Sequence, residues 1–201
     1  MASVTIAPKD VAELRARTGA GMMDCKRALE EAGGEMEKAA EILRKKGIAK
    51  AEKRAGRTAS QGLVVSYIHH NHQVGVLLEI NSETDFVARN EAFKELARDV
   101  ALHIASADPI GVNAEDIPAE LLERERRIAE EQVAAEGKPE NVRAKIVEGK
   151  LKKFVAERTL LEQPYVRDDS KTVGDLVKEV SGKLGEAITV RRFARFQIGA
   201  A

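Results

Sequence analysis

One stretch, Ser82 to Ala105, constrains the fold more than any other part of the chain. Its second half carries apolar side chains three and four positions apart, which is the spacing of a helix that buries one face. The members of this stripe are Phe93, Leu96, Ala97, Val100, Ala101 and Ile104. We therefore predict a core helix over this half, directly after a strand.

The first half of the stretch places an acidic residue beside a large aromatic one. Asp85 can act as an N-cap or as a first-turn acid, which the helix dipole favours. Phe86 lies seven residues before Phe93, so a continuous helix would carry it on the buried stripe. Asn90 is itself a good N-cap and can instead separate a short turn from the main helix, leaving Phe86 to point elsewhere. From the residues alone both alternatives stay open.

Composition restricts the class of protein. The 201 residues, 43% hydrophobic and 33% charged, are typical of a soluble globular protein with one large or two small domains. No apolar run approaches the roughly 20 residues that span a bilayer, and the N-terminus lacks the apolar region of a signal peptide. We therefore expect a cytoplasmic protein without a membrane partner. Basic and acidic residues are equal in number, 33 each, and aromatic residues make up 3%, so we expect no direct binding of nucleic acid.

Three short helices are predicted at the N-terminus, over residues 8–18, 22–32 and 35–46, the last ending at Gly47. Their apolar positions would form a thin core of Val11, Leu14, Ala28, Leu29, Ala39 and Leu43. Cys25, the only cysteine, is predicted to be a small buried residue rather than a reactive thiol. A bundle of this size is a more plausible docking module than a catalytic scaffold.

Met22 and Met23 begin the second of these helices. Adjacent helical positions are about 100° apart, so both side chains cannot lie at the centre of one narrow buried face. Either one of them faces water or a partner, or both lie at the edge of a small core. A methionine beside the turn of residues 18–21 would be an adaptable docking contact.

The segment from Arg44 to Arg57 contains seven basic residues and one acidic residue. We interpret it as a solvated basic connector rather than an RNA-binding element, and we place a domain boundary here, with domains at residues 1–54 and 55–201. Residues 62–70 and 73–80 then read as a β-hairpin. The alternative, a binding module for RNA, would use the basic segment.

Three histidines, His69, His70 and His72, lie at the predicted hairpin tip. Alternate strand residues share a face, so His70 and His72 would point together only if the strand continued through them, and no third ligand is placed by the spacing. We predict no metal site. A metal-dependent hydrolase that uses His70, His72 and Glu79 is the alternative.

The rest of the chain predicts a helical hairpin followed by a return to the sheet. Residues 119–136 and 139–158 read as two charged helices broken at 137–139, residues 160–169 as an extended connector, 172–184 as a helix and 188–198 as a strand. The hairpin seam would contain Leu121, Leu122, Ile128, Val133, Val142, Ile146, Val147, Leu151 and Phe154. The last strand would pair with the first hairpin, giving an α+β fold with a small antiparallel sheet packed with helices. Its outer face, with Phe193 near Arg191 and Arg195, is a candidate contact surface.

Two segments resemble bacterial elongation factor Ts, the guanine-nucleotide exchange factor of elongation factor Tu. They are Leu14 to Leu29, LRARTGAGMMDCKRAL, and Glu79 to Arg89, EINSETDFVAR. The later segments PYVRDDSKTV and VRRFARFQIG are also similar to this family, so the resemblance covers essentially the whole chain.

The resemblance implies a ubiquitin-associated-like N-terminal bundle over residues 1–54, and an α+β core with a protruding helical hairpin inserted at about 119–158. It further implies that Met22 and Met23 dock the bundle on the GTPase domain of elongation factor Tu. Thr84, Asp85, Phe86 and Val87 would insert beside the nucleotide site and displace Mg²⁺ and GDP, after which GTP rebinds.

The chain has room for one sheet-forming unit, whereas longer family members carry two. It therefore resembles the short form, which implies a symmetric homodimer that binds two partner molecules. The strand that ends near Phe196 is our candidate for the dimer surface. An exchange factor performs no covalent chemistry, so we expect no enzyme activity, no catalytic residues and no cofactor.

Overall fold

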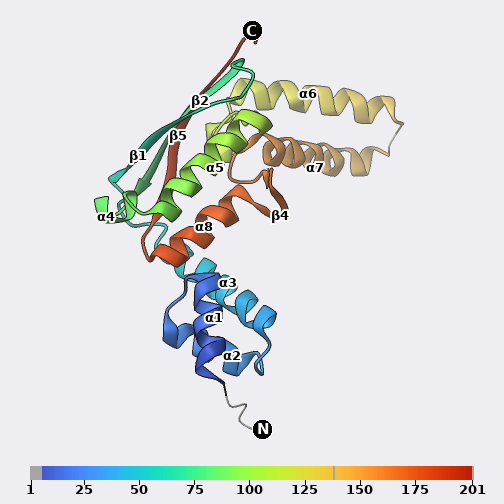
Figure 1. Ribbon diagram of the computed structural model, residues 1–201. Helices are drawn as coiled ribbons and strands as arrows, with labels where there is room; N and C mark the ends of the chain where they lie inside the picture. Colours follow the sequence, from blue (N-terminus) through green and yellow to red (C-terminus); the bar gives the residue numbers. More distant parts are fainter. Residues whose placement is uncertain (1–5, 138, 201) are drawn as a thin grey trace. The chain divides into compact units, whose positions relative to one another are not determined.

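The computed structural model of the protein describes residues 6–137 and 139–200. It combines helices with a small sheet, which confirms the predicted α+β class (Figure 1). The chain divides into two compact units. The first unit comprises the chain up to Gly62, Asn81–Lys94 and Val177–Thr189, and the second comprises Leu63–Ile80, Glu95–Leu176 and the chain from Val190 onward. None of the described helices is both long and apolar enough to cross a membrane.

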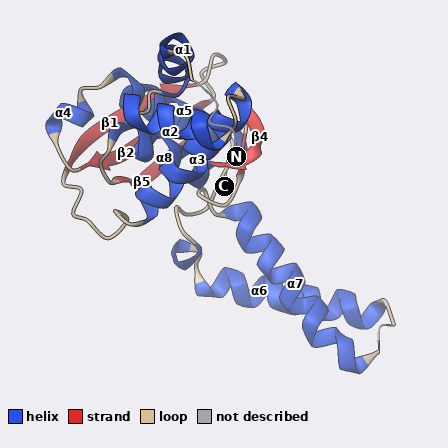
Figure 2. Cartoon of the chain, turned by 90° about the horizontal axis from the view of Figure 1, so that it is seen from below, coloured by secondary structure: helices blue, strands red, loops and turns tan. Residues whose placement is uncertain are grey.

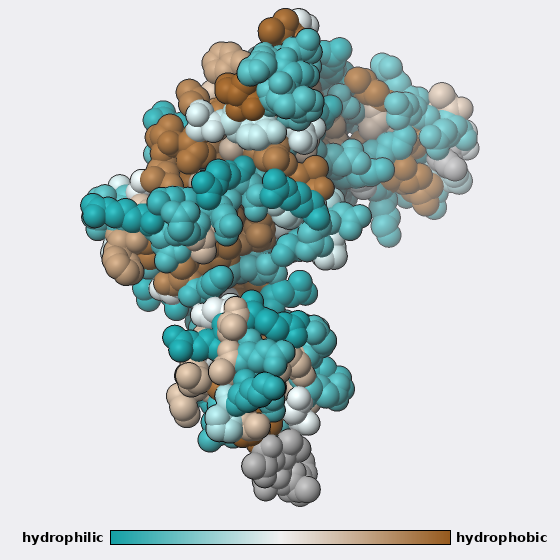
Figure 3. All heavy atoms as spheres, in the orientation of Figure 1, coloured by the Kyte–Doolittle hydropathy of each residue, from teal (hydrophilic) through white to brown (hydrophobic). Residues whose placement is uncertain are grey.

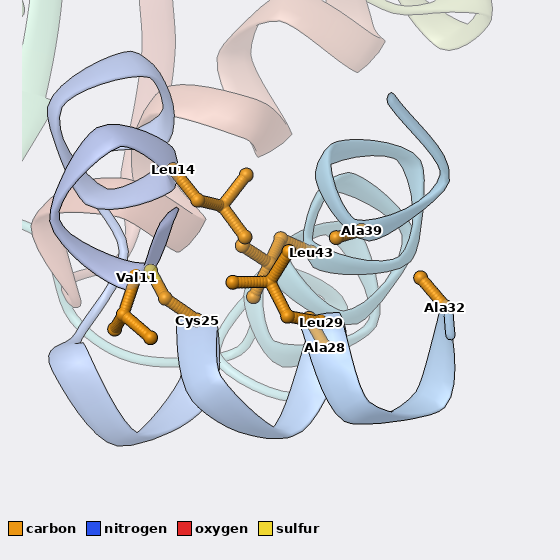
Figure 4. Packing of buried hydrophobic residues seen from close by; sticks show 8 residues of the cluster. All are labelled: Val11, Leu14, Cys25, Ala28, Leu29, Ala32, Ala39 and Leu43. Carbon is orange, nitrogen blue, oxygen red and sulfur yellow. The ribbon is translucent and has the colours of Figure 1, made fainter. Parts of the chain in front are cut away.

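The N-terminal part of the first unit is a bundle of three helices, α1 (Pro8–Thr18), α2 (Met22–Glu31) and α3 (Met36–Glu52). α1 ends where Gly19 adopts a left-handed conformation, with φ of 68°, and its N–H donates to the Arg15 carbonyl at 2.8 Å. All six predicted core residues are buried, and Cys25 and Ala32 join them. Figure 4 shows these side chains converging from the three helices on one centre.

The third helix is longer than predicted. α3 continues through Gly47 to Glu52, so the expected end at Lys46 was wrong and the first part of the basic segment is helical. Gly47 packs against Gly182 of α8 (Val173–Leu184): a Cβ atom added to Gly182 would lie 2.7 Å from the Gly47 carbonyl oxygen. The backbones of α3 and α8 therefore approach more closely than a side chain at Gly182 would permit. A glycine inside a helix has the same appearance in the sequence as one that ends a helix.

The sheet has the strand order β1-β2-β5. β1 (Gln61–Ile68) and β2 (Val74–Ser82) form the predicted hairpin, and β5 (Ile188–Gln197) lies next to β2, which confirms the predicted pairing. Helix α5 (Glu91–Ala107) lies along the sheet in Figures 1 and 2. Every member of the predicted stripe of α5 is buried, so this helix is the core helix that the sequence indicates.

β5 departs from the predicted alternation of inner and outer residues. Val190 is buried, but Arg191 and Arg192 are both exposed, and after them the odd-numbered residues Phe193 and Arg195 are the more buried ones. This change of phase within a strand is the effect that a β-bulge has. Phe193 and Arg195 therefore do not share an exposed outer face with Arg191, and the predicted contact surface was wrong.

Arg195 has a structural task at the end of α5. Its Nε and Nη2 atoms lie 3.4 and 3.2 Å from the Ala105 carbonyl oxygen, and its Nη1 forms an ion pair with Asp108 at 3.0 Å. The last carbonyls of a helix have no partner within the helix, and a guanidinium satisfies them well. The large apolar residues exposed near the end of β5 are instead Phe196 and Ile198.

The second unit also contains the predicted helical hairpin, formed by α6 (Ala119–Ala135) and α7 (Glu140–Arg158). The two helices run side by side and project from the rest of this unit (Figure 2). Of the predicted seam, Val133 and Val147 are buried together with Ala129, whereas Ile128 and Val142 are exposed. Lys138, in the predicted break, lies outside the described residues, while Gly137 has φ of 65° and Pro139 precedes α7.

The segment predicted as an extended connector contains a short ribbon of β3 (Pro164–Tyr165) and β4 (Asp168–Thr172), which run antiparallel. A buried histidine of α5 helps to hold it. His103 Nδ1 accepts a hydrogen bond from Val166 N at 3.2 Å, so Nε2 carries the proton and donates to Gln163 Oε1 at 2.9 Å. Burial lowers the pKa of His103, because desolvation disfavours the charged imidazolium.

Gly182→Ala should destabilise the protein, because the new methyl group would collide with the backbone of Gly47. Gly149→Ala is the matched control. Gly149 lies inside α7, and apart from its chain neighbours and the backbone of α7 around it, no heavy atom of the described chain comes within 4 Å of a Cβ added there. This control should gain about 1 kcal/mol from helix propensity. Urea unfolding of both variants gives the comparison, and a gain in stability for Gly182→Ala would contradict the close packing.

Stability should fall at mildly acidic pH. The folded-state pKa of His103 lies below the ordinary 6.5, so the unfolded chain takes up the proton first. The contribution of neutral His103 is present above the unfolded pKa and is lost as the pH falls from there towards the folded pKa. We expect His103→Gln to reduce the pH dependence of urea unfolding below about pH 6.5. An unchanged pH dependence in His103→Gln would refute this assignment.

Candidate functional site

The candidate site is α4 (Asp85–Ala88), a single turn that directly follows β2. Thr84 is its N-cap, and its side chain accepts a hydrogen bond from Val87 N at 3.3 Å. Ser82, buried at the end of β2, donates from Oγ to the Thr84 carbonyl oxygen at 2.9 Å. Val87 and Ala88 pack inside, each 4% exposed. The turn is therefore held by hydrogen bonds at its start and by buried side chains at its end.

Phe86 points away from this anchored turn. It is 79% exposed, more than any other large hydrophobic side chain in the described ranges. The core helix α5 starts separately after it, and Asn90 Oδ1 accepts a hydrogen bond from Ala92 N at 2.9 Å, as an N-cap does. Of the two alternatives for this segment, the short turn is confirmed and the continuous helix with a buried Phe86 is wrong.

Asp85 is also exposed. Its carboxylate forms an ion pair with Arg89, one helical turn further on, at 2.8 Å, and both side chains are more than half exposed. Such a surface pair contributes at most about 1 kcal/mol, so it can be exchanged for contacts with a partner at little cost. The four residues that the resemblance indicated thus have different positions. Asp85 and Phe86 are exposed, Thr84 caps the turn, and Val87 is buried and anchors it.

Two carboxylates that sequence reasoning missed hold the start of α4. Glu186, in the loop between α8 and β5, accepts hydrogen bonds from Thr84 N at 2.9 Å and from Thr84 Oγ1 at 2.6 Å. Glu83 accepts in return from Ala187 N at 2.7 Å. The segments 83–84 and 186–187 are therefore held together by hydrogen bonds in both directions, because the glutamate of each segment accepts from the other segment. Glu186 lies about a hundred positions along the chain from Thr84, and no spacing or motif predicts such a contact.

The second predicted contact point is the start of α2. Met22 is 49% exposed and Met23 is 64% exposed, so both methionines face solvent. Asp24, next to them, binds Lys50 of α3 at 3.1 Å and Arg27 at 2.5 Å. The hydrogen bond from Lys50 lowers the pKa of Asp24, and the carboxylate links the head of α2 to α3. The two methionines thus lie on the first turn of α2, which the Asp24–Lys50 ion pair holds against α3.

His70 and His72 lie in the turn between β1 and β2, beyond the strands themselves. His72 has a left-handed backbone, with φ of 57°. His69 Nδ1 lies 3.0 Å from Tyr67 Oη, and its ring centroid is 4.2 Å from that of His70. Among the described residues, no group of three or more His, Cys, Asp or Glu side chains is placed to hold a metal ion.

Comparison with protein families matches residues 5–200 of this chain to the model described as Elongation factor TS. The match includes both predicted contact points, the methionine pair and the α4 turn. The chain belongs to the elongation factor Ts family. It is therefore a translation elongation factor, and it serves as the nucleotide-exchange factor for elongation factor Tu.

Individual members of the elongation factor Ts family are similar along nearly their full length. The elongation factor Ts of Carboxydothermus hydrogenoformans is 58% identical over 94% of this chain and 87% of its own. That of Desulfosudis oleivorans is 53% identical over 97% of this chain and 98% of its own. That of Caldanaerobacter subterraneus subsp. tengcongensis is 55% identical over 96% of this chain and 97% of its own.

Proposed function

We propose that the α4 turn is the part of this exchange factor that opens the nucleotide site of elongation factor Tu. In this proposal the segment Thr84, Asp85, Phe86 and Val87 inserts beside the nucleotide, displaces Mg²⁺ and GDP, and lets GTP rebind. One observation carries the proposal: Phe86 is a large aromatic side chain, 79% exposed, on a turn that is anchored at both ends. An exposed aromatic on a rigid support is the usual form of an interaction anchor.

The mechanism requires no covalent chemistry. A factor that binds the nucleotide-free partner more tightly than the nucleotide-bound partner must, by linkage, weaken nucleotide binding by the same factor. Phe86 would act as a wedge against the elements that hold the diphosphate, and the charge of Asp85 would disturb the polar groups around Mg²⁺. Release that is about a thousandfold faster needs a barrier lower by about 4 kcal/mol, which a few desolvated contacts can supply.

We also propose that residues 1–54 form a separate docking domain of the ubiquitin-associated type, with 55–201 as the core domain. The support is the closed hydrophobic cluster of α1, α2 and α3 and the exposure of Met22 and Met23. The face of the bundle seen in Figure 3 is largely hydrophilic. Two exposed methionines on such a bundle are suitable apolar contacts for a partner. This docking would take place in the cytoplasm, where elongation factor Tu works.

A symmetric homodimer is the assembly that we propose, giving a complex of two plus two chains. The support is the sheet of the second unit, which exposes large apolar side chains on all three strands: Val64, Ile68, Leu77 and Phe196, with Ile198 just beyond β5. In β1 and β2 these residues alternate with more buried ones, so they lie on the face of the sheet away from the core. An uncovered apolar sheet face suits a second copy of the same face.

Phe86→Ala should slow the release of labelled GDP from elongation factor Tu by about ten- to a hundredfold, which corresponds to roughly 1.4 to 2.7 kcal/mol of lost barrier lowering. Stability should change by less than about 1 kcal/mol, because the side chain is exposed. Asp85→Ala should also slow release, since it removes the charge at the tip. Stopped-flow release and thermal unfolding are measured on the same samples.

The control for this experiment is Met23→Ala. If the methionines dock the factor and α4 performs the exchange, this variant should need a higher concentration for half-maximal release while the maximal rate stays close to that of the parent. Full exchange activity of both Phe86→Ala and Asp85→Ala would refute the role of α4.

For the dimer, light scattering on the free protein should give twice the mass of one chain at micromolar concentration. Phe196→Asp places a charge on the proposed contact face and should shift the protein towards monomer. Val166→Asp is the control, because Val166 is an exposed apolar residue of the β3–β4 turn, outside the sheet. A monomeric parent protein, or an equal effect of both substitutions, would exclude the proposed face.

A further inference from the structure

We propose that Glu186 is a positioning residue for nucleotide exchange: by accepting both hydrogen bonds of Thr84, its carboxylate sets the direction in which α4 presents Phe86. The inference rests on the proposed role of α4 and extends it to a residue in a distant part of the chain. Glu186 itself lies beside the turn and acts through Thr84.

The contact geometry makes Glu186 an effective clamp. Its two oxygens are both used, since Oε2 accepts from Thr84 N at 2.9 Å and Oε1 accepts from Thr84 Oγ1 at 2.6 Å. The same Thr84 Oγ1 accepts the capping hydrogen bond from Val87 N. One carboxylate therefore orients both the backbone before α4 and the side chain that caps it. Hydrogen bonds to an ionised acceptor are about twice as strong as neutral ones.

Glu186 is held in place from its own side. α8 ends at Leu184, and Gly185 follows it with φ of 80°; the Gly185 N–H donates to the Ser181 carbonyl oxygen at 2.9 Å. Ser181 Oγ then donates to the Glu186 carbonyl oxygen at 2.5 Å. Ala187, the next residue, is buried, and its N–H donates to Glu83. The backbone of Glu186 is thus fixed before, at and after the residue, so its carboxylate is a stable reference point.

The distribution of contacts on α4 explains why the hydrogen bonds to Glu186 would determine the direction in which Phe86 points. Val87 and Ala88 anchor the far end of the turn, whereas Phe86 itself has no buried side to hold it. An isolated turn of four residues is too short to be stable alone. Without Glu186, we expect the start of α4 to swing about its buried end and carry Phe86 with it. A displacement of about 1 Å in a positioned group can cost up to a hundredfold in rate.

Glu186→Ala in the full-length chain tests the proposal, with release of labelled GDP from elongation factor Tu as the readout. The maximal release rate should fall about tenfold, because the wedge is no longer aimed. The concentration for half-maximal release should stay within about twofold, because the docking methionines are untouched. Glu95→Ala is the matched control, because Glu95 is an exposed glutamate of α5, outside α4 and its clamp. It should release GDP as fast as the parent.

Glu186→Gln separates positioning from charge and from general loss of folding. A glutamine can still accept from Thr84 N with its oxygen and donate to Thr84 Oγ1 with its amide nitrogen, so it should recover most of the maximal rate. If Glu186→Ala unfolds, Glu186→Gln still decides, because the folded glutamine variant keeps the geometry without the charge. A glutamine variant as slow as Phe86→Ala would overturn positioning by hydrogen bonds.

A double-mutant cycle shows whether Glu186 acts through Phe86. If it does, Glu186→Ala should cost much less in the Phe86→Ala background than in the parent. Additive losses, or a parent-like maximal rate for folded Glu186→Ala, would refute the positioning role while leaving the role of α4 intact. If Phe86→Ala and Asp85→Ala both release GDP at the parent rate, the proposed function of α4 fails instead, and the two failures are distinct.

Discussion

A turn of four residues cannot hold its own shape, and this constraint governs the arrangement around the candidate site. Nucleating a helical turn fixes several backbone dihedrals for one hydrogen bond, so the stability of α4 has to come from its surroundings. Those surroundings are a buried serine at the end of β2, two buried residues at the end of the turn, and the carboxylates of Glu83 and Glu186. The exposed position of Phe86 depends on all of them, because the phenyl ring itself is mostly exposed and contributes little burial.

Exposed apolar side chains are the common property of the surfaces to which we assign contacts. Phe86, Met22 and Met23 in the first unit and the outer face of the sheet in the second leave hydrophobic area in water. Each square ångström of such area gains about 25 cal/mol when a partner covers it. Burial of this exposed area in a complex therefore contributes favourably to the free energy of binding. In an exchange factor, the part of that energy that is gained only with the nucleotide-free partner drives release.

Several residues have tasks that are visible only once segments distant in the sequence are brought together. Gly182 lacks a side chain where the backbone of Gly47 approaches it, so its small size matters for packing, while Gly47 lies inside α3 and does not end it. Arg195 lies on a strand and satisfies the last turn of α5. His103 is a buried base whose neutral form accepts a hydrogen bond from the chain near β3. In each case the partner is supplied by another element.

Local patterns in the sequence determined most of the elements, since hydrophobic periodicity and capping residues act within a few positions. The buried stripe of α5, the core of the N-terminal bundle, the β1–β2 hairpin and the α6–α7 hairpin follow from such patterns, and the family motifs led to Met22, Met23 and the segment 84–87. Tertiary structure alone decided between the two alternatives for Phe86, since a side chain seven residues before the stripe is buried or exposed according to whether Asn90 interrupts the helix. It also decided the length of α3, the change of phase in β5 and the partnership of Thr84 with Glu186. These features depend on contacts between segments far apart in the chain, and periodicity within one segment carries no information about them.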